Sequence, residues 1–248
     1  MTPANSPLPS LPTPAYRRIL LKISGEALMG DGEYGISPAV INRVADEVKE
    51  LIDLGVQVGM VIGGGNICRG AGLSAAGMDR VTGDHMGMLA TVLNALAMQD
   101  ALEQKNVYTR VMSAIKINQI CEDYIRRRAV RHLEKGRVVI VAGGTARPYV
   151  THDTAAVSFA LELDCELVLK ASKVEGVYDK DPAQFSDAVK LDQVSFQEAV
   201  EDNAIKVMDK AAMGLAMEQN KPVVVFDIMT DDNFLKVIKG EPIGTRIS

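Results

Sequence analysis

Short apolar runs alternate with helical patterns from residue 17 onward. Residues 18–24 (RILLKIS) predict a buried strand, and residues 56–62 predict a second strand that runs into three glycines. Between them, apolar residues repeat at helical spacing after Ser37 and Pro38, a pair typical of a helix start, and Gly55 ends the helix. This order of strand, helix and strand is typical of parallel α/β sheets.

The same alternation continues to the end of the chain. Further helices are predicted over residues 85–104 (with Asp84 as the cap), 118–134, 153–163 and 209–219. Further strands are predicted over residues 107–113, 137–142, 166–170 and 222–228, with a last helix and strand after them. The stretch up to about Val194 is predicted to be irregular, and Ser195 with Glu198 has the form of a capping box.

Strands joined by helices pair in parallel through right-handed crossovers. Near-continuous apolar strands indicate a sheet that is covered on both faces. No internal repeat or linker interrupts residues 17–248. We therefore predict one α/β domain over residues 17–248, a three-layer αβα sandwich with a mainly parallel central sheet. Ligands of such sheets bind at the carboxyl ends of the strands.

Residues 1–16 differ from the rest in composition. They are rich in proline and serine, and they lack the basic start and apolar core of a secretory signal, so we expect a disordered or extended tail. No run of eighteen apolar residues occurs, so no membrane span is expected. Cys68, Cys121 and Cys165 are odd in number and far apart, which disfavours disulfides and zinc and favours a reducing cytoplasm.

Charge narrows the classes of ligand. The 248 residues include 27 basic and 32 acidic side chains, a formal charge of -5. This balance argues against a nucleic-acid-binding protein with a broad basic surface. It leaves room for a local cationic pocket that takes a phosphorylated small molecule.

Four turns that carry glycine or lysine follow predicted strands. They cover residues 22–26 (KISGE), 63–66 (GGGN), 143–145 (GGT) and 170–173 (KASK). Glycine lets backbone N–H groups approach an anion, and a following helix N-terminus adds favourable partial charge. One such turn is usually a plain turn, whereas four in one domain favour phosphate binding. Neither a GxxxxGK[ST] loop nor a GxGxxG fingerprint is present, so a different loop architecture is expected.

Several of these polar residues admit two interpretations. Lys22 is either a lysine that reaches water from a strand end or a cation aimed at a transferring phosphoryl group. Lys170 repeats the arrangement, with Lys173 close by. Asp153 is either a helix N-cap or part of a nucleotide pocket, and Tyr178 either stacks on a base or lies in a surface turn.

The remaining polar residues form no recognisable catalytic set. His85 at a helix start is predicted to cap or to face solvent, and His132 is predicted to be exposed. The basic residues between 126 and 137 form either a solvated helix face or a contact for an anionic effector or another subunit. The methionines between residues 78 and 112 are expected to fill a core or an interface.

Six stretches together point to a known family. They are RILLKISGEAL (18–28), VGMVIGGGNICRGAG (58–72), RVTGDHMGMLATVLNALAMQDAL (80–102), DTAAVSFALEL (153–163), LVLKASKVEGVYDKDP (167–182) and AIKVMDKAAM (204–213). On these stretches, which span almost the whole domain, the chain resembles the amino-acid-kinase superfamily and, within it, the bacterial UMP kinases. The segments GGGN-x-x-RG and GDHMGMLAT carry the second, narrower resemblance.

The resemblance implies an activity and an assembly. It implies transfer of the γ-phosphoryl group of ATP to UMP, with Mg²⁺, in pyrimidine nucleotide biosynthesis. It implies an αβα sandwich unrelated to the P-loop kinases. It also implies a cytoplasmic homohexamer that needs no nucleic acid or membrane, with GTP as a possible activator and UTP as a possible inhibitor.

The resemblance also assigns roles to residues. It assigns the ATP site to Lys22, Ile23, Ser24, Gly25, Gly65, Arg69, Ser172, Tyr178 and Asp181. It assigns the UMP site to Gly64, Asp84, Thr145, Ala146, Arg147, Pro148, Tyr149, Val150, Thr151 and His152. Catalysis falls to Lys22, Arg69 and a second lysine, Lys170 or Lys173, with Asp209 orienting the lysines. No residue is assigned as a metal ligand.

The chain departs from the family pattern at the UMP site. The family usually reads TGNPFFTTD where this chain reads TARPYVTHD, so Arg147 replaces an asparagine and His152 replaces a threonine. We therefore expect UMP affinity or its pH response to differ. Gln99 and Glu103 stand where some members carry arginine and histidine, which bears on regulation.

Two other functions remain open at this point. One is an acyl-phosphate-forming member of the superfamily that acts on an amino acid or carbamate; Asp84 and the GGGN-x-x-RG loop argue against it. The other is a nucleotide-sensing protein without turnover, against which the intact Lys22 and Lys170 weigh.

Overall fold

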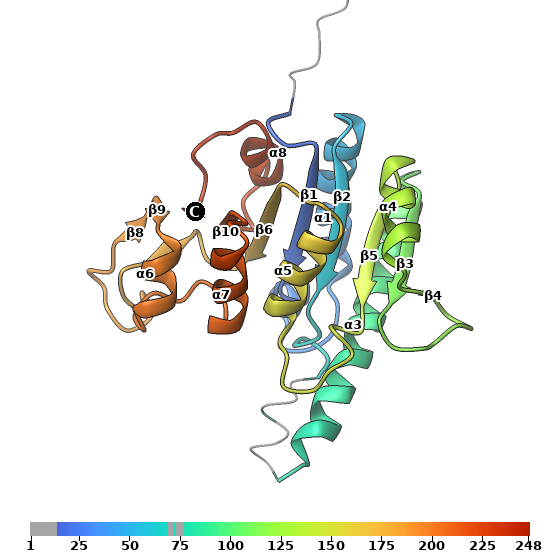
Figure 1. The fold of residues 1–248 in the computed structure, drawn as a ribbon, viewed down its shortest axis with the longest axis horizontal. Helices are drawn as coiled ribbons and strands as arrows, with labels where there is room; N and C mark the ends of the chain where they lie inside the picture. Colours follow the sequence, from blue (N-terminus) through green and yellow to red (C-terminus); the bar gives the residue numbers. More distant parts are fainter. Residues whose placement is uncertain (1–13, 69–71, 73–76) are drawn as a thin grey trace, which may run out of the picture.

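The fold is organised around a central sheet, described here by a computed structural model for residues 14–68, 72 and 77–248 (Figure 1). Six parallel strands form its middle, in the order β3 (Thr109–Ser113), β5 (Val138–Ala142), β2 (Gln57–Ile62), β1 (Arg18–Ile23), β6 (Leu167–Ser172) and β10 (Val223–Asp227). At one edge β4 (Glu122–Asp123) pairs with β3 in parallel. At the other edge β11 (Thr245–Ile247) runs antiparallel to β10 and pairs with β9 (Gln193–Val194).

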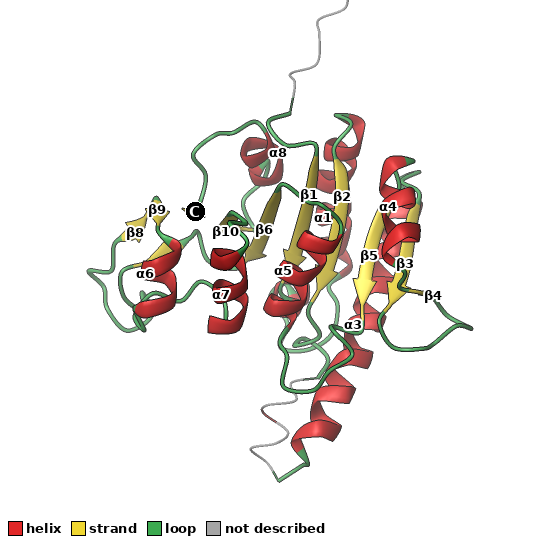
Figure 2. Cartoon of the chain, viewed as in Figure 1, coloured by secondary structure: helices red, strands yellow, loops and turns green. Residues whose placement is uncertain are grey.

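Helices cover both faces of the sheet (Figure 2). One layer consists of α1 (Pro38–Asp53), α3 (Arg80–Glu103) and α8 (Asn233–Ile238). The other consists of α4 (Arg126–Glu134), α5 (His152–Glu162), α6 (Phe196–Glu201) and α7 (Lys210–Glu218). Neighbouring residues of β1 serve both layers, because Ile19 and Leu21 belong to the first hydrophobic cluster and Leu20 to the second. The predicted three-layer αβα sandwich with a mainly parallel sheet is confirmed.

Local signals explain several helix boundaries. The Ser37 hydroxyl accepts a hydrogen bond from the Val40 amide, Pro38 is the first helical residue, and Gly55 follows the helix at φ +83°. The predicted capping box of α6 is present, with Ser195 and Glu198 each accepting a hydrogen bond from the other's backbone. These predictions from single residues are confirmed.

Two predicted helix starts are wrong, and so is one predicted cap. The helix α3 begins at Arg80, because the Asp79 carboxylate caps the Thr82 amide at 2.8 Å, so Asp84 lies inside the helix rather than at its cap. The helix predicted from residue 118 begins only at Arg126, since β4 extends the sheet before it. The helix α5 begins at His152, with Thr151 as its cap, which excludes Asp153 from that role.

Several short elements and the exposure of His132 also differ from prediction. The stretch predicted to be irregular contains β9 and a two-stranded sheet of β7 (Val177–Tyr178) and β8 (Lys190–Leu191). The predicted tail lies mostly outside the described residues. However, the Ala15 amide donates to the Ile238 carbonyl at 2.9 Å, so the packed chain begins before residue 17. The His132 side chain is only 13% exposed rather than exposed as predicted, because it packs between Glu122 and Arg137.

The carboxyl ends of the parallel strands define one edge of the molecule. At this edge β1 continues into a 3₁₀ helix (Gly25–Met29), β2 into the three glycines 63–65, and β5 into residues 143–151. The N-terminal part of α3 extends past the sheet on the same side (Figure 1). In the ranges that the structure describes, no helix is long and apolar enough to cross a membrane.

Candidate active site

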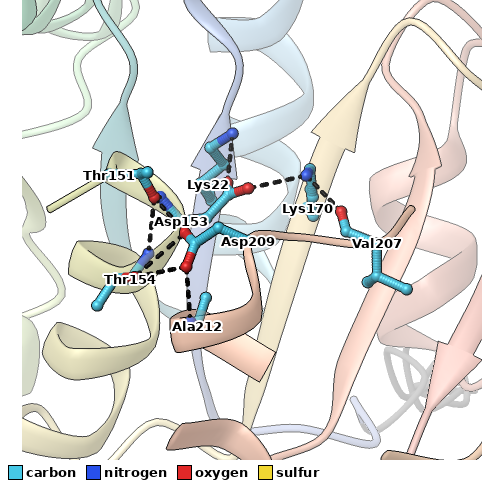
Figure 3. Close-up of polar contacts among 8 residues, drawn as sticks. All are labelled: Lys22, Thr151, Asp153, Thr154, Lys170, Val207, Asp209 and Ala212. Atoms are coloured by element: carbon cyan, nitrogen blue, oxygen red, sulfur yellow. Dashed lines mark hydrogen bonds and ion pairs between the residues drawn. The ribbon is translucent and has the colours of Figure 1, made fainter. Parts of the chain in front are cut away.

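Two lysines and a carboxylate form the centre of the candidate site (Figure 3). Lys22 of β1 and Lys170 of β6 are direct partners in the register of two neighbouring parallel strands. Asp153, in the first turn of α5, lies between them: Lys22 Nζ is 2.7 Å from Oδ1 and Lys170 Nζ is 3.1 Å from Oδ2. Lys22 is only 7% exposed. The strand register and the start of α5 thus bring together residues that are far apart in sequence.

Lys22, Asp153 and Lys170 together carry a net positive charge near the carboxyl ends of the strands. Burial alone raises the pKa of Asp153, but the two lysines lower it more, so its pKa lies below the usual range and the carboxylate is ionised. Burial lowers the pKa of Lys170, an effect that Asp153 partly offsets. Lys170 also donates to the Val207 carbonyl. Two ammonium groups around one carboxylate are arranged to attract a further anion.

Asp209 contacts α5 and α7 rather than the two lysines themselves, so its role in orienting the lysines stays a prediction. It caps α7 by accepting from the Ala212 amide at 2.9 Å, and it accepts hydrogen bonds from the hydroxyls of Thr151 and Thr154 at the start of α5. These contacts join α7 to α5 and thereby fix the helix that carries Asp153. The carboxylate that pairs directly with the two cluster lysines is that of Asp153.

The glycines of the site allow two loops and a helix to approach closely. A Cβ atom on Gly25 would lie 2.5 Å from the Gly63 carbonyl oxygen and 2.7 Å from the Gly65 amide nitrogen. A Cβ atom on Gly64 would lie 2.7 Å from the Gly87 carbonyl oxygen of α3. Neither separation is possible for a real side chain, so these positions require glycine. The close packing explains why the turns after β1 and β2 are rich in glycine.

Buried polar side chains of α3 hold these loops, and the sequence analysis missed them. The Asn94 amide donates to the Gly63 carbonyl at 2.7 Å, and Asn66 and Asn94 exchange hydrogen bonds at 2.7 and 2.9 Å. The Thr91 hydroxyl accepts from the Gly143 amide at 2.8 Å. The GGGN stretch and the polar residues on an otherwise apolar helix were visible signals, but their pairing depends on how α3 crosses the sheet.

Two cavities meet beside the lysine cluster. One, of about 210 Å³, is lined by Lys22, Ser24, Gly25, Glu26, Asp153 and residues of the glycine loop. The other, of about 190 Å³, is lined by Arg80, Asp84, Gly144, Val150 and further residues of α3. Both include Gly64, Gly65, Thr151 and His152 in their walls. The two spaces therefore lie side by side, with the lysine cluster at one of them.

The second cavity is shaped by contacts between α3 and the loop after β5. The Asp84 carboxylate lies 2.9 Å from Arg80 Nε and accepts from the Tyr149 amide at 2.8 Å. The Arg80 guanidinium lies 5.4 Å from the centre of the Tyr149 ring. These contacts hold a loop in which Ala146 and Tyr149 adopt left-handed φ values of 58° and 67°.

The predicted UMP residues occupy this region to different degrees. Gly64, Asp84, Val150, Thr151 and His152 line the second cavity. Thr145 and Pro148 are half-buried in the loop, and Arg147 is exposed.

The predicted ATP residues fall into two groups. Lys22, Ser24, Gly25 and Gly65 line the cavity at the lysine cluster, and Ile23 is the last residue of β1. Tyr178 and Asp181 line a separate cavity of about 250 Å³ beyond β6. Ser172 ends β6 and accepts a hydrogen bond from the Val174 amide. Arg69 lies outside the described residues.

The two candidates for the second lysine are separated by the structure. Lys170 belongs to the buried cluster. Lys173 donates to the Gly30 carbonyl at 2.8 Å, at the end of the 3₁₀ helix. The geometry therefore places Lys170, rather than Lys173, beside Lys22.

Comparison with known proteins adds family information to this geometry. The family model described as "Amino acid kinase family" matches residues 17–227. The chain belongs to the amino acid kinase family. The uridylate kinase of Xanthomonas oryzae pv. oryzae is 58% identical over 233 residues, which cover 94% of this chain and 97% of that protein. The uridylate kinase of Dichelobacter nodosus is 54% identical and covers 95% of this chain and 98% of that protein.

Solved structures of the amino acid kinase family have the same architecture. The crystal structure of UMP kinase from Bacillus anthracis superposes with a TM-score of 0.90 at 38% identity, covering 94% of this chain and 96% of that one. The UMP kinase of Ureaplasma parvum gives a TM-score of 0.87 at 34% identity, covering 94% and 98%. The resemblance to bacterial UMP kinases within the amino acid kinase family is confirmed.

Proposed function

We propose that this member of the amino acid kinase family transfers the γ-phosphoryl group of ATP to UMP, giving ADP and UDP for pyrimidine nucleotide biosynthesis. The observation that carries the proposal is the pair of cavities that share Gly64, Gly65, Thr151 and His152, one of which has Lys22 and Asp153 in its wall. Relatives named uridylate kinase over nearly the full chain support UMP as the acceptor.

The reaction needs electrostatic help more than a base. An oxygen of the UMP phosphate attacks the γ-phosphorus as the bond to the β,γ-bridging oxygen breaks, and ADP leaves with the electron pair. The attacking oxygen is already anionic at neutral pH, so no proton has to be removed. The main obstacle is the repulsion between two polyanions, which positioning and positive charge offset. We propose that Lys22 and Lys170 supply that charge, with Arg69 as a third cation.

The backbone of the two glycine loops supports in-line alignment of the phosphates. We propose that the amides of Ser24 and Gly25 bind the donor phosphates and that Gly64 and Gly65 lie between donor and acceptor. The ATP base and ribose are proposed to occupy the cavity at Tyr178 and Asp181. The UMP ribose is proposed to bind Asp84, whose carboxylate is held by Arg80 and the Tyr149 amide.

Magnesium fits this site as a partner of the nucleotide. Mg²⁺ commonly binds substrate phosphates with only one or two protein carboxylates. Across residues 14–68, 72 and 77–248 no group of three or more His, Cys, Asp or Glu side chains is arranged to hold a metal. Asp153, a carboxylate in the wall of the cavity at Lys22, is engaged by both lysines. We propose that the phosphates hold the ion, which adds positive charge to the transferring group.

Assembly and control are proposed on the resemblance. We propose a cytoplasmic homohexamer with GTP activation and UTP inhibition. All three cysteines are free, in keeping with a reducing compartment. The basic residues of α4 remain either a solvated face or an effector or subunit contact. Within the described chain, some of them pair with acidic neighbours, as Arg126 does with Asp164 at 2.7 Å.

The test is an ADP-release assay with a panel of acceptors. UMP is expected to give fast ATP-dependent ADP release, whereas CMP, dUMP, carbamate and amino acids are compared at equal concentration. Rapid release with carbamate or an amino acid, and none with UMP, would favour the acyl-phosphate alternative. Tight nucleotide binding without ADP release would favour a nucleotide sensor.

Lys22→Ala tests the central cation. Loss of one charge at the transferring group costs about 3 kcal/mol or more of transition-state stabilisation, so turnover is expected to fall at least about a hundredfold. UMP binding by calorimetry and the far-UV circular dichroism spectrum are expected to persist. Lys49→Ala, on the outside of α1, is the control and should keep full activity. A Lys22→Ala enzyme with more than half the wild-type rate would exclude the phosphate role.

A further inference from the structure

His152 occupies the wall between the two cavities. It is the first residue of α5 and lines both the cavity at Lys22 and the cavity at Asp84. Its ring lies beside Gly144, where a Cβ atom would be 3.6 Å from Nε2. Within the described residues no hydrogen bond to the ring is found. An imidazole at this point therefore faces the space where the acceptor phosphate must approach the donor.

Charged side chains of several elements line the cavities beside His152, among them Glu26 of the 3₁₀ helix. Lys22 projects from β1, Asp153 is the next residue of α5, and Asp84 and Arg80 line the same cavity from α3. Lys170 of β6 lies behind Asp153. Burial is the largest influence and Lys22 the next, and together they lower the pKa of His152 to about 4 in spite of the two aspartates. The ring is therefore neutral at pH 7 when the cavities hold no anion.

We propose that His152 binds the acceptor phosphate and takes up a proton when it does so, which makes UMP binding tighter as the pH falls. The inference rests on the proposed function, because it requires UMP in the cavity at Asp84. It concerns a property of this chain's own histidine, since the family pattern has a threonine at the same position.

The proton uptake follows from the charges. A bound phosphate brings up to two negative charges into a space shielded from water, where they oppose the repulsion from Lys22 and raise the pKa of His152. Linkage then gives the direction of the pH dependence of binding. A ligand that raises the pKa of a group binds more tightly as the pH falls, between the pKa of that group in the complex and its lower pKa in the free protein. Within that window, affinity changes by up to about tenfold per pH unit. A threonine makes a hydrogen bond at the same place with no such dependence.

Calorimetry on the full-length protein tests the proposal. UMP binding to wild type and to His152→Thr is measured at pH 6 and pH 8, each in two buffers of different ionisation heat. At pH 6 the proton uptake of wild type is expected to exceed that of His152→Thr by roughly half a proton or more. The Kd of His152→Thr divided by that of wild type is expected to be at least about twofold larger at pH 6 than at pH 8. The UMP phosphate itself also titrates in this range, but its contribution is the same for both proteins and cancels when wild type is compared with His152→Thr.

A second measurement avoids reliance on the His152→Thr protein. The chain has only three histidines, His85, His132 and His152, so the Cε1–H resonances of the wild type are few enough to follow by NMR. The His152 resonance, assigned with His152→Asn, is expected to titrate at a pH at least one unit higher with saturating UMP than without it. His85 and His132 serve as internal references.

The outcomes separate this inference from the proposed function. UMP binding and phosphorylation with equal proton uptake in wild type and His152→Thr, or an unmoved His152 titration, would overturn the role of His152 and leave the kinase proposal intact. Absence of UMP binding to wild type at either pH would instead reject the proposed function. A pH-dependent Kd ratio together with a raised His152 pKa supports the inference.

Discussion

At the scale of single residues, the site depends on three charged side chains that stabilise one another. Lys22 and Lys170 are both largely buried, and a buried ammonium group is costly without a partner. Asp153 supplies that partner to both lysines in the protein without nucleotide. Because one carboxylate serves two cations, the cluster keeps a net positive charge. This explains how two lysines are kept at strand ends that are otherwise apolar.

Gly25 offers a direct test of the loop geometry. We expect Gly25→Ala to fold with reduced stability and to lose at least about tenfold in kcat, since the added methyl would force the turns after β1 and β2 apart. Steady-state kinetics and thermal denaturation provide the measurement.

Gly214→Ala is the matched control for this substitution. Gly214 lies inside α7, where an added methyl group would have no neighbour within 4 Å, and alanine there favours the helix by about 0.5–1 kcal/mol. Its activity should equal that of wild type. Full activity in Gly25→Ala would mean that the two loops can separate without harm, contrary to the proposed alignment of phosphates.

At the scale of elements, α3 acts as a frame for two loops. Its exposed side carries apolar residues, while its buried side carries Thr91 and Asn94, which bind the Gly143 amide and the Gly63 carbonyl. One helix therefore sets the distance between the turn after β2 and the turn after β5. Residues of both turns line the cavity assigned to UMP.

Thr91→Val tests this frame. The valine keeps the shape but leaves the Gly143 amide without its acceptor, at a cost of about 1–3 kcal/mol in unfolding free energy. We expect KM for UMP to rise at least about threefold while KM for ATP changes little, because the loosened loop borders the acceptor cavity.

The control is Thr109→Val, which removes another fully buried hydroxyl at a site on β3 where it donates to the Val107 carbonyl. It should lower stability without moving KM for UMP. If both variants changed KM equally, the effect would be one of general stability and not of the α3 frame.

The contact between α1 and α8 gives a prediction on pH. Burial raises the pKa of Glu47 to about 7, against a lowering by its hydrogen bond with the Phe234 amide and by Arg43. A raised carboxyl pKa stabilises the fold below about pH 4.5, and that stabilisation is lost as the pH rises to about 7. Between pH 5 and pH 8 wild type should therefore lose up to about 3 kcal/mol more in unfolding free energy than Glu47→Gln.

Urea denaturation at the two pH values measures this difference. Glu218→Gln, at an exposed position on α7, is the control and should follow the wild-type pH dependence. Identical pH dependence in wild type and Glu47→Gln would show that Glu47 stays ionised in the folded protein.

Prediction from sequence succeeded where a local signal decides the structure. The strand at residues 18–24, the cap at Ser37 and the capping box at Ser195 all depend on neighbouring residues, and all are present. The failures depend on distant partners. The strand β4 has two residues and exists because it pairs with β3, so no periodic pattern marks it.

The same division applies to the site. Lys22, the glycine turns and Asp84 could be found as candidates from their place after predicted strands or by resemblance. The exchange of hydrogen bonds between Asn66 and Asn94, and the position of Asp153 between two lysines, follow from the crossing of helices over the sheet. Sequence spacing does not contain that crossing, which is why the pairing of Asp153 with both lysines was not predicted.

At the scale of the whole molecule, one outer face is unusually apolar. Leu89 and Leu93 of α3 are 51% and 53% exposed, and with Tyr34 and Met86 they line a hollow of about 560 Å³. Exposed apolar patches of this kind commonly mark contacts between proteins. The resemblance implies a homohexamer, so we propose a second copy of the chain as the occupant of this face.

Sedimentation equilibrium tests this assignment. Wild type is expected at a multiple of 26.7 kDa, and Leu89→Lys with Leu93→Lys is expected to shift the population to smaller species, because two ammonium groups would be buried in the interface. Val189→Lys, at a position that is 60% exposed and far from α3 in sequence, is the control and should keep the wild-type mass.

Contact with a second copy of the chain on α3 is expected to affect UMP binding. Cys68 lines both the apolar hollow and the cavity assigned to UMP, so a partner seated on α3 would support one wall of the acceptor site. The double lysine variant should therefore lose UMP affinity along with mass, while Val189→Lys keeps both. A wild-type mass of one chain would remove the proposed interface. A dissociated variant with unchanged UMP affinity would show that the cavity assigned to UMP keeps its structure without the partner.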